Sequence, residues 1–125
     1  MADVPRLVEQ LRRFAAERDW DQFHDPKNLA MALVVEAGEL VEIFQWLTPE
    51  QSQQVMGDAK KAAAVREELA DIYGYLLRLA DLLEVSLDEA LEEKLVTNAE
   101  KYPVDLSRGN ATKYTELRTS PRNQE

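Results

Sequence analysis

The sequence contains no cysteine, only four glycines and five prolines, and no apolar run of the roughly 18 residues that a membrane span needs. The missing cysteine excludes a disulfide framework, a thiolate metal site and a catalytic thiol. Scarce glycine and proline, with abundant Leu, Ala and Glu, favour helices over a turn-rich β fold. Because the N-terminus also lacks a basic segment followed by an apolar one, we expect a soluble, cytoplasmic protein that does not enter membranes.

Positive charge is scarce as well. The chain has 24 acidic residues against 15 Lys and Arg, which gives a formal net charge of -9 at pH 7. Binding to nucleic acid through phosphate neutralisation requires a basic surface, so nucleic acid is not an expected partner. An anionic small molecule remains compatible with this charge if a divalent cation supplies the missing positive charge.

Apolar residues recur at helical spacing in four long segments, which predicts an all-α fold. Three of these segments begin with a capping signal or an early proline: Pro5, Asp25 before Pro26, and Ser86 with Glu89. The predicted helices cover residues 5–18, 26–46, 60–83 and 87–101, with a short helix from Thr48 to about Gly57. Pro103 ends the last of them, so we expect a domain over residues 1–103 and an extended or partly disordered tail over 104–125.

Two of the predicted helices carry acids inside their apolar stripe. On a helical wheel, Glu36 lies at the centre of the stripe of the second helix and Glu39 lies on its shoulder. Glu68 and Asp71 occupy the same positions on the third long helix. If the two helices pack face to face, four carboxylates converge, and their burial without partners costs on the order of several kcal/mol each. A cation would relieve this cost.

Oxygen ligands without histidine or cysteine fit a hard divalent ion, either Mg²⁺ or Mn²⁺. A single E-x-x-E is weak evidence, because surface charge pairs have the same spacing, but two pairs inside apolar stripes are more specific. A ferritin-like di-iron site requires Glu-x-x-His pairs, and the one histidine, His24, lies outside both helices. The alternative that stays open is a non-catalytic helical module that binds a metal or a partner.

The acidic motifs resemble those of the MazG-like all-α NTP pyrophosphatases, in which E-x-x-E is followed on the next long helix by E-x-x-D. The stretch RDWDQFHDPKNLAMALVVEAGELVEIFQW is similar to the dCTP pyrophosphatase branch of that family. The resemblance covers residues 5–103. It implies a four-helix bundle that assembles as a homodimer or homotetramer and converts a dNTP, dCTP or a modified dCTP, to the monophosphate and pyrophosphate in nucleotide-pool house-cleaning.

The resemblance also implies roles for individual residues. Glu36, Glu39, Glu68 and Asp71 match the family's Mg²⁺ ligands, and either Glu36 or Glu39 would activate the attacking water. The residues that match the family's nucleotide pocket are Trp20, Phe23 and His24 before the second helix, Trp46, Tyr75, and Lys94, Asn98, Lys101 and Tyr102 at the fourth helix.

From the residues alone, these pocket assignments stay open. Aromatic side chains at helical spacing pack in a core as readily as they stack on a base. Lys94, Asn98 and Lys101 share one helix face, which fits either a phosphate clamp or a solvated surface. His24 fits a base or ribose contact better than the role of general base. The resemblance has one departure, because Leu11 stands where the vertebrate dCTP enzymes have a histidine, and this leaves the base preference open. A damaged dNTP or a phosphoribosyl intermediate is a further alternative substrate.

Overall fold

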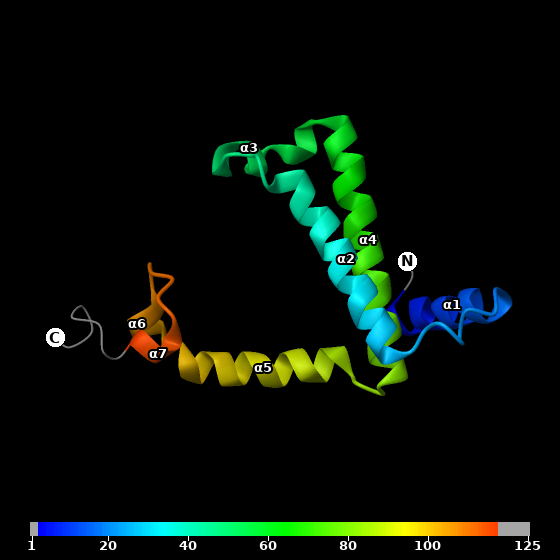
Figure 1. Ribbon diagram of the computed structural model, residues 1–125. Coiled ribbons are helices and arrows are strands. Elements are labelled where there is room, and N and C mark those ends of the chain that lie inside the picture. The colour runs from blue at the N-terminus through cyan, green and yellow to red at the C-terminus, as the bar shows by residue number, and fades with distance from the viewer. Residues whose placement is uncertain (1–2, 118–125) are drawn as a thin grey trace. The chain divides into compact units, whose positions relative to one another are not determined.

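The computed structural model describes residues 3–117, and all regular elements in this part of the chain are helices (Figure 1). The predicted all-α class is therefore confirmed. The chain divides into two compact units that meet in sequence between Val85 and Ser86. No helix within the described residues is both long enough and apolar enough to cross a membrane.

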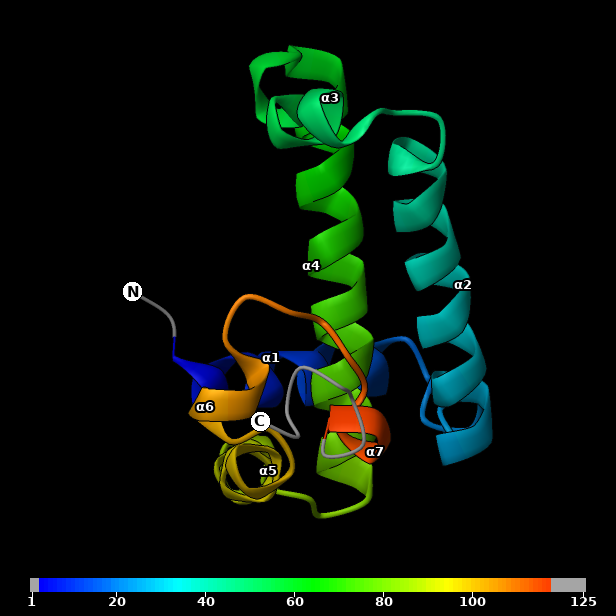
Figure 2. The same ribbon diagram turned by 90° about the vertical axis from the view of Figure 1, so that its left-hand side faces the viewer.

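The first unit is built around two antiparallel helices, α2 (Pro26–Phe44) and α4 (Ala59–Leu82), which lie side by side in both ribbon views (Figures 1 and 2). At one end they are connected by α3 (Pro49–Gln53) and a 3-10 turn, η1 (Val55–Gly57). Near the other end α1 (Val4–Glu17) packs against α4. The three long helices predicted for this part of the sequence are present, with boundaries shifted by at most two residues, and the short helix predicted from Thr48 to about Gly57 is divided into α3 and η1.

Side-chain caps determine where these helices begin. The Asp25 carboxylate accepts a hydrogen bond of 2.8 Å from the backbone N–H of Asn28, and Pro26 occupies the first turn of α2. Thr48 forms a reciprocal capping box with Gln51 at the start of α3. These local bonds satisfy backbone N–H groups that a helix start leaves unpaired, which is why the sequence signals predicted the starts correctly.

The second unit contains α5 (Leu87–Lys101), α6 (Val104–Ser107) and α7 (Tyr114–Leu117). The sequence analysis expected an extended tail from residue 104, whereas the described part of this segment contains two four-residue helices. Their basis is local packing: Leu117 is only 1% exposed, and the Tyr114 ring lies edge-on to Tyr102 at 5.9 Å. Residues 118–125 lie outside the described part, and the domain boundary at residue 103 stays a prediction.

An ion-pair network connects α1 to α4. The Arg12 guanidinium on α1 donates two hydrogen bonds to the Asp81 carboxylate, one of them 2.7 Å long from Nε. The hydrogen bonds from Arg12 hold the pKa of Asp81 below its ordinary value, although partial burial of the carboxyl acts in the opposite direction. Arg78, from the same helix as Asp81, approaches the same carboxylate at 3.8 Å.

We expect Arg12→Gln to lower the melting temperature at pH 7, because it removes the main partner of Asp81. Since the folded-state pKa of Asp81 lies below its ordinary 3.8, the ion pair stabilises the fold above that pH and is lost as the pH falls through the lower value. The difference in melting temperature between variant and wild type should therefore shrink as the pH falls below 3.8. Arg13→Gln is the matched control, because Arg13 forms no ion pair within residues 3–117. A difference that persists at low pH would contradict this account.

Candidate active site

Three carboxylates converge where α2 faces α4. Glu36 and Glu39 lie three residues apart on α2, so both project from one side of that helix. Glu68 comes from α4, and one carboxylate oxygen from each of the three residues lies within 4.8 Å of the others. We call these residues the carboxylate triad. The face-to-face packing on which the predicted convergence depended is therefore present.

Two of the three acids of the triad are partly buried, whereas Glu39 is exposed. Oε2 of Glu36 and Oε2 of Glu68 are buried and have no hydrogen-bond partner within residues 3–117. The adjacent Glu68 carboxyl, followed by burial, raises the pKa of Glu36, and the Glu36 carboxyl is the main cause of a raised pKa at Glu39. At Glu68 the Glu36 carboxyl lowers the pKa, but burial and the acids around it raise it further, so the net shift is upward. Each acid therefore resists ionisation beside the others.

A divalent cation fits this arrangement. Buried carboxylate oxygens without donors destabilise the folded state, and no Lys or Arg forms an ion pair with the triad in the described part of the chain. The donor set consists of oxygen alone, as hard cations such as Mg²⁺ and Mn²⁺ prefer. The two partnerless oxygens are therefore the atoms that a bound cation would satisfy.

Asp71, the fourth expected ligand, is exposed and lies outside the group of three whose oxygens meet. It is nevertheless close to them, because its charge contributes to the raised pKa values of Glu36 and Glu68. Asp71 also lines a neighbouring cavity. It therefore stands between the triad and that cavity.

The cavity beside Asp71 has a volume of about 250 Å³ and lies between α1, α4 and the loop that connects α1 to α2. Its wall is mainly apolar and aromatic, and the charged or polar side chains of His24, Asp71 and Arg78 also line it. The side chains that form it include Phe14, Trp20, His24, Tyr75 and Arg78. Three of the expected pocket residues, Trp20, His24 and Tyr75, are thus brought together next to an expected metal ligand.

The loop that carries Trp20 and His24 is held by backbone bonds. At the end of α1, Asp19 adopts a left-handed conformation with φ 55, and the Trp20 N–H bonds to the Ala15 carbonyl at 2.9 Å. This pattern is a Schellman motif, which turns the chain sharply after the helix. The His24 N–H then bonds to the Trp20 carbonyl at 3.1 Å, and the ring centroids of Trp20 and Phe14 lie 5.7 Å apart, edge to face. The two pocket side chains are therefore fixed before α2 begins.

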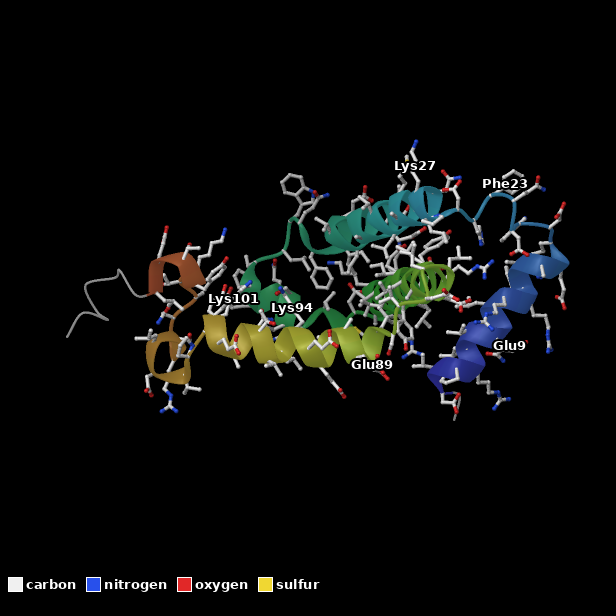
Figure 3. All side chains as sticks on the ribbon, turned by 90° about the horizontal axis from the view of Figure 1, so that it is seen from below. Glu9, Phe23, Lys27, Glu89, Lys94 and Lys101 are labelled. Carbon is white, nitrogen blue, oxygen red and sulfur yellow. The ribbon has the colours of Figure 1, made fainter. Side chains whose placement is uncertain are left out.

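The structure does not bring Phe23 or Trp46 to this cavity. The Phe23 side chain is 60% exposed and lies on the outside of the loop (Figure 3). Trp46 is 86% exposed and lines a separate cavity of about 420 Å³ with Lys60 and Lys61. It follows the C-terminal end of α2, whose 19 residues span about 28 Å from the end near His24. Nucleotide contacts for Phe23 and Trp46 stay predictions.

The expected residues of α5 belong to the second unit. Lys94 and Lys101 lie on the same side of the helix (Figure 3), and Asn98 lies between them in sequence. The Lys101 ammonium lies 4.7 Å from the centre of the Tyr114 ring, against which Tyr102 also packs. These contacts explain the local positions of Lys101 and Tyr102, and a phosphate-binding role for this face stays a prediction.

The sequence analysis missed Arg78, which is buried in the cavity wall. A signal was present, because Arg78 follows Asp71 by seven residues and therefore lies on the same face of the helix two turns later. Its acidic partner Asp21, which accepts a hydrogen bond of 2.6 Å from it, lies far away in sequence and gave no such signal.

Comparison with known proteins shows to which protein family this chain belongs. Residues 31–117 match the MazG-like family, and this range includes the triad, Asp71 and α5. The chain belongs to the MazG-like family. The predicted MazG-like fold is confirmed by this match, which also extends beyond the expected domain boundary at residue 103.

Individual relatives of this MazG-like chain agree with the family match. It is 49% identical to dCTP pyrophosphatase 1 of Mus musculus and 46% identical to that of Homo sapiens, each over 117 residues, which are 94% of this chain and 67% of the relative. A crystal structure of a pyrophosphatase from Archaeoglobus fulgidus is similar with a TM-score of 0.75 at 38% identity. That similarity covers 82% of this chain and 94% of the other.

We expect Glu68→Gln to raise the melting temperature of the metal-free protein at pH 7, because it removes one charge from the triad. The folded-state pKa values of the triad lie above the ordinary 4.5, so the destabilisation is absent below that pH and grows as the pH rises through the raised values. The gain should therefore be larger at pH 7 than at pH 4 in melts with EDTA.

The matched control is Glu67→Gln, since Glu67 is the exposed neighbour of Glu68 on α4. It should leave the melting temperature nearly unchanged at both pH values. A Glu68→Gln variant that melts well below the wild type at pH 7 without metal would mean that Glu68 is a structural acid.

Proposed function

We propose that this chain hydrolyses dCTP, or a modified dCTP, to the monophosphate and pyrophosphate with Mg²⁺ as cofactor. The observation that carries the proposal is the convergence of Glu36, Glu39 and Glu68 beside a cavity with an aromatic wall. Metal-supported cleavage of a triphosphate needs clustered carboxylates, and selection of a nucleotide needs an adjacent pocket with flat apolar walls. The identity of nearly half to two curated dCTP pyrophosphatases supports dCTP as substrate.

The triad and Asp71 would hold Mg²⁺, which when bound neutralises charge on the triphosphate and on the transition state. Glu36 and Glu68 supply the two buried oxygens that lack other partners. Glu39 and Asp71 are exposed and complete the set from the solvent side. Asp71 faces both the triad and the cavity, so the phosphate chain would run past it.

The reaction itself is an in-line displacement at the α-phosphorus. A water oxygen forms the new bond to phosphorus, the bond to the oxygen that bridges the α and β phosphates breaks, and pyrophosphate leaves. Glu36 or Glu39 accepts the proton of that water, because each carries a carboxylate of the triad and acts as a base when ionised. The monophosphate keeps its base in the cavity.

The size of the cavity decides which part of the nucleotide it takes. Sites that enclose a whole small-molecule ligand measure about 300–1,000 Å³. The 250 Å³ beside Asp71 is smaller, so it suits the base and part of the sugar while the triphosphate extends to the acids. Trp20 and Tyr75 offer rings for stacking on the base, and His24 offers a polar ring atom.

We also propose that the protein is a homodimer or homotetramer. Large apolar side chains are exposed on both long helices of the first unit, which a monomer rarely tolerates over adjoining positions. On α2 these are Met31, Val34, Val35 and Val41, and on α4 they are Leu69, Tyr73 and Leu76. A second copy of the chain would cover them. A cytoplasmic location stays a proposal from the sequence.

Turnover of dNTPs and NTPs with Mg²⁺ in ¹⁸O-labelled water tests the reaction. We expect dCTP to be the best substrate, pyrophosphate to be the released product, and the label to enter dCMP. Label in pyrophosphate, or a nucleoside diphosphate as product, would overturn attack at the α-phosphorus. No turnover of any nucleotide with Mg²⁺ or Mn²⁺ would favour a non-catalytic module.

Glu36→Gln should reduce kcat for dCTP by at least about a hundredfold, because even outer-shell changes at metal sites cost 10–100-fold. Glu67→Gln should retain activity near that of the wild type, since Glu67 points away from the triad on an exposed face. Steady-state release of pyrophosphate measures both. A Glu36→Gln variant that retains more than a tenth of wild-type kcat would show that Glu36 is not part of the active site.

A further inference from the structure

Arg78 is a buried cation with three partners, and the proposed reaction assigns it no role. Its side chain on α4 is among the few buried polar groups of the described chain, at 7% exposure for the residue. Nη2 donates a hydrogen bond of 2.6 Å to Asp21, and Nη1 lies 3.8 Å from Asp81. Nε donates to Nδ1 of His24 at 3.4 Å. The guanidinium is therefore held by two carboxylates while it contacts the imidazole.

This contact determines which nitrogen of His24 carries the proton. A guanidinium has five N–H donors and no acceptor, so Nδ1 of His24 must be the acceptor in this bond. A neutral imidazole has one N–H, which then resides on Nε2. Within residues 3–117 the imidazole makes no other hydrogen bond, so Nε2 is the atom left for a ligand.

His24 and Arg78 both line the cavity beside Asp71, together with Trp20 and Tyr75. The planar guanidinium is held in place by Asp21, and the Trp20 ring lies beside the imidazole with centroids 6.2 Å apart. Since the ring is restrained on two sides, its N–H donor has one defined position in the cavity wall.

We propose that Arg78 is a positioning residue that fixes His24 as an Nε2–H donor, so that the cavity selects a nucleobase by an acceptor atom. The acceptor is a carbonyl oxygen or a ring nitrogen with a lone pair, both of which a cytosine ring offers. Only the identity of the ligand rests on the proposed function, because the state of His24 follows from Arg78 alone. A base that presents an N–H group at this position leaves two donors facing each other and is rejected.

The tautomer can be measured directly, because the chain contains a single histidine. Long-range ¹H–¹⁵N correlation spectra at about pH 8.5, where histidine is largely neutral, distinguish the two ring nitrogens. We expect one tautomer in the wild type, with the proton on Nε2, and a mixture in Arg78→Lys. Arg12→Gln is the control: it removes a partner of Asp81 but no contact of His24, and should leave the spectrum unchanged. A wild-type proton on Nδ1, or a mixture, would overturn the proposal.

A double-mutant cycle separates positioning from general stability. Arg78→Lys should raise KM for dCTP about tenfold, the effect of roughly one hydrogen bond, with kcat within about twofold. In a His24→Ala background the same change should have little further effect, while His24→Gln, which keeps an amide donor, should restore part of the affinity. Equal effects of Arg78→Lys in both backgrounds would mean that Arg78 acts on the fold instead of through His24.

A second variant tests the same proposal in case Arg78→Lys does not fold. Asp21→Asn weakens the hold on Arg78 at a side chain that is 58% exposed, so the fold should persist. It should shift the His24 tautomer toward a mixture and raise KM for dCTP by a few fold. If the wild type turns over no nucleotide, the proposed function fails while the tautomer experiment still decides the role of Arg78.

Discussion

Repulsion among three carboxylates at the interface of α2 and α4 is the constraint on which the rest of this structure depends. Aliphatic side chains in the positions of Glu36 and Glu68 would pack the two helices without an electrostatic cost. Instead, two buried oxygens lack hydrogen-bond partners among residues 3–117, and the surrounding acids and burial give Glu36 and Glu68 raised pKa values. The same interface holds the first unit together and brings the acids close to one another, so binding of the proposed cation would be coupled to folding stability.

The remaining elements of the first unit place a specific pocket next to that site. The Schellman turn after α1 and the hydrogen bonds of Arg78 hold the loop with Trp20 and His24 against α4. Asp71 connects the cavity to the triad. In the proposed function, the pocket of about 250 Å³ would bind the base and the acids would hold the metal and the phosphates, so selectivity and chemistry would come from separate groups of residues on rigid elements.

The features of the structure that depend on residues close in sequence could be predicted, and those that depend on residues far apart in sequence could not. The caps at Asp25 and Thr48 predicted helix starts because their hydrogen bonds span three residues. The wheel predicted that Glu36, Glu39, Glu68 and Asp71 converge, because acids within an apolar stripe face a neighbouring helix, and the first three of them meet while Asp71 lies outside the group. The hydrogen bond from Arg78 to Asp21 joins residues that are 57 positions apart in sequence. It depends on the conformation of the loop that carries Asp21, which no helical pattern encodes. The two helices after residue 103 have four residues each, which is too short for an apolar periodicity to show in the sequence.

The central claim is that the carboxylate triad binds a divalent cation, and Mn²⁺ titration followed by electron paramagnetic resonance tests it most directly, since protein-bound Mn²⁺ loses the signal of the free ion. We expect saturable binding by the wild type, displacement of Mn²⁺ by Mg²⁺, and loss of that binding in Glu68→Gln but not in Glu67→Gln. All titrations use one protein concentration, so that differences in protein concentration do not alter the oligomeric state between samples. A wild-type protein that leaves Mn²⁺ free, or a Glu68→Gln variant that binds it equally well, would contradict the account.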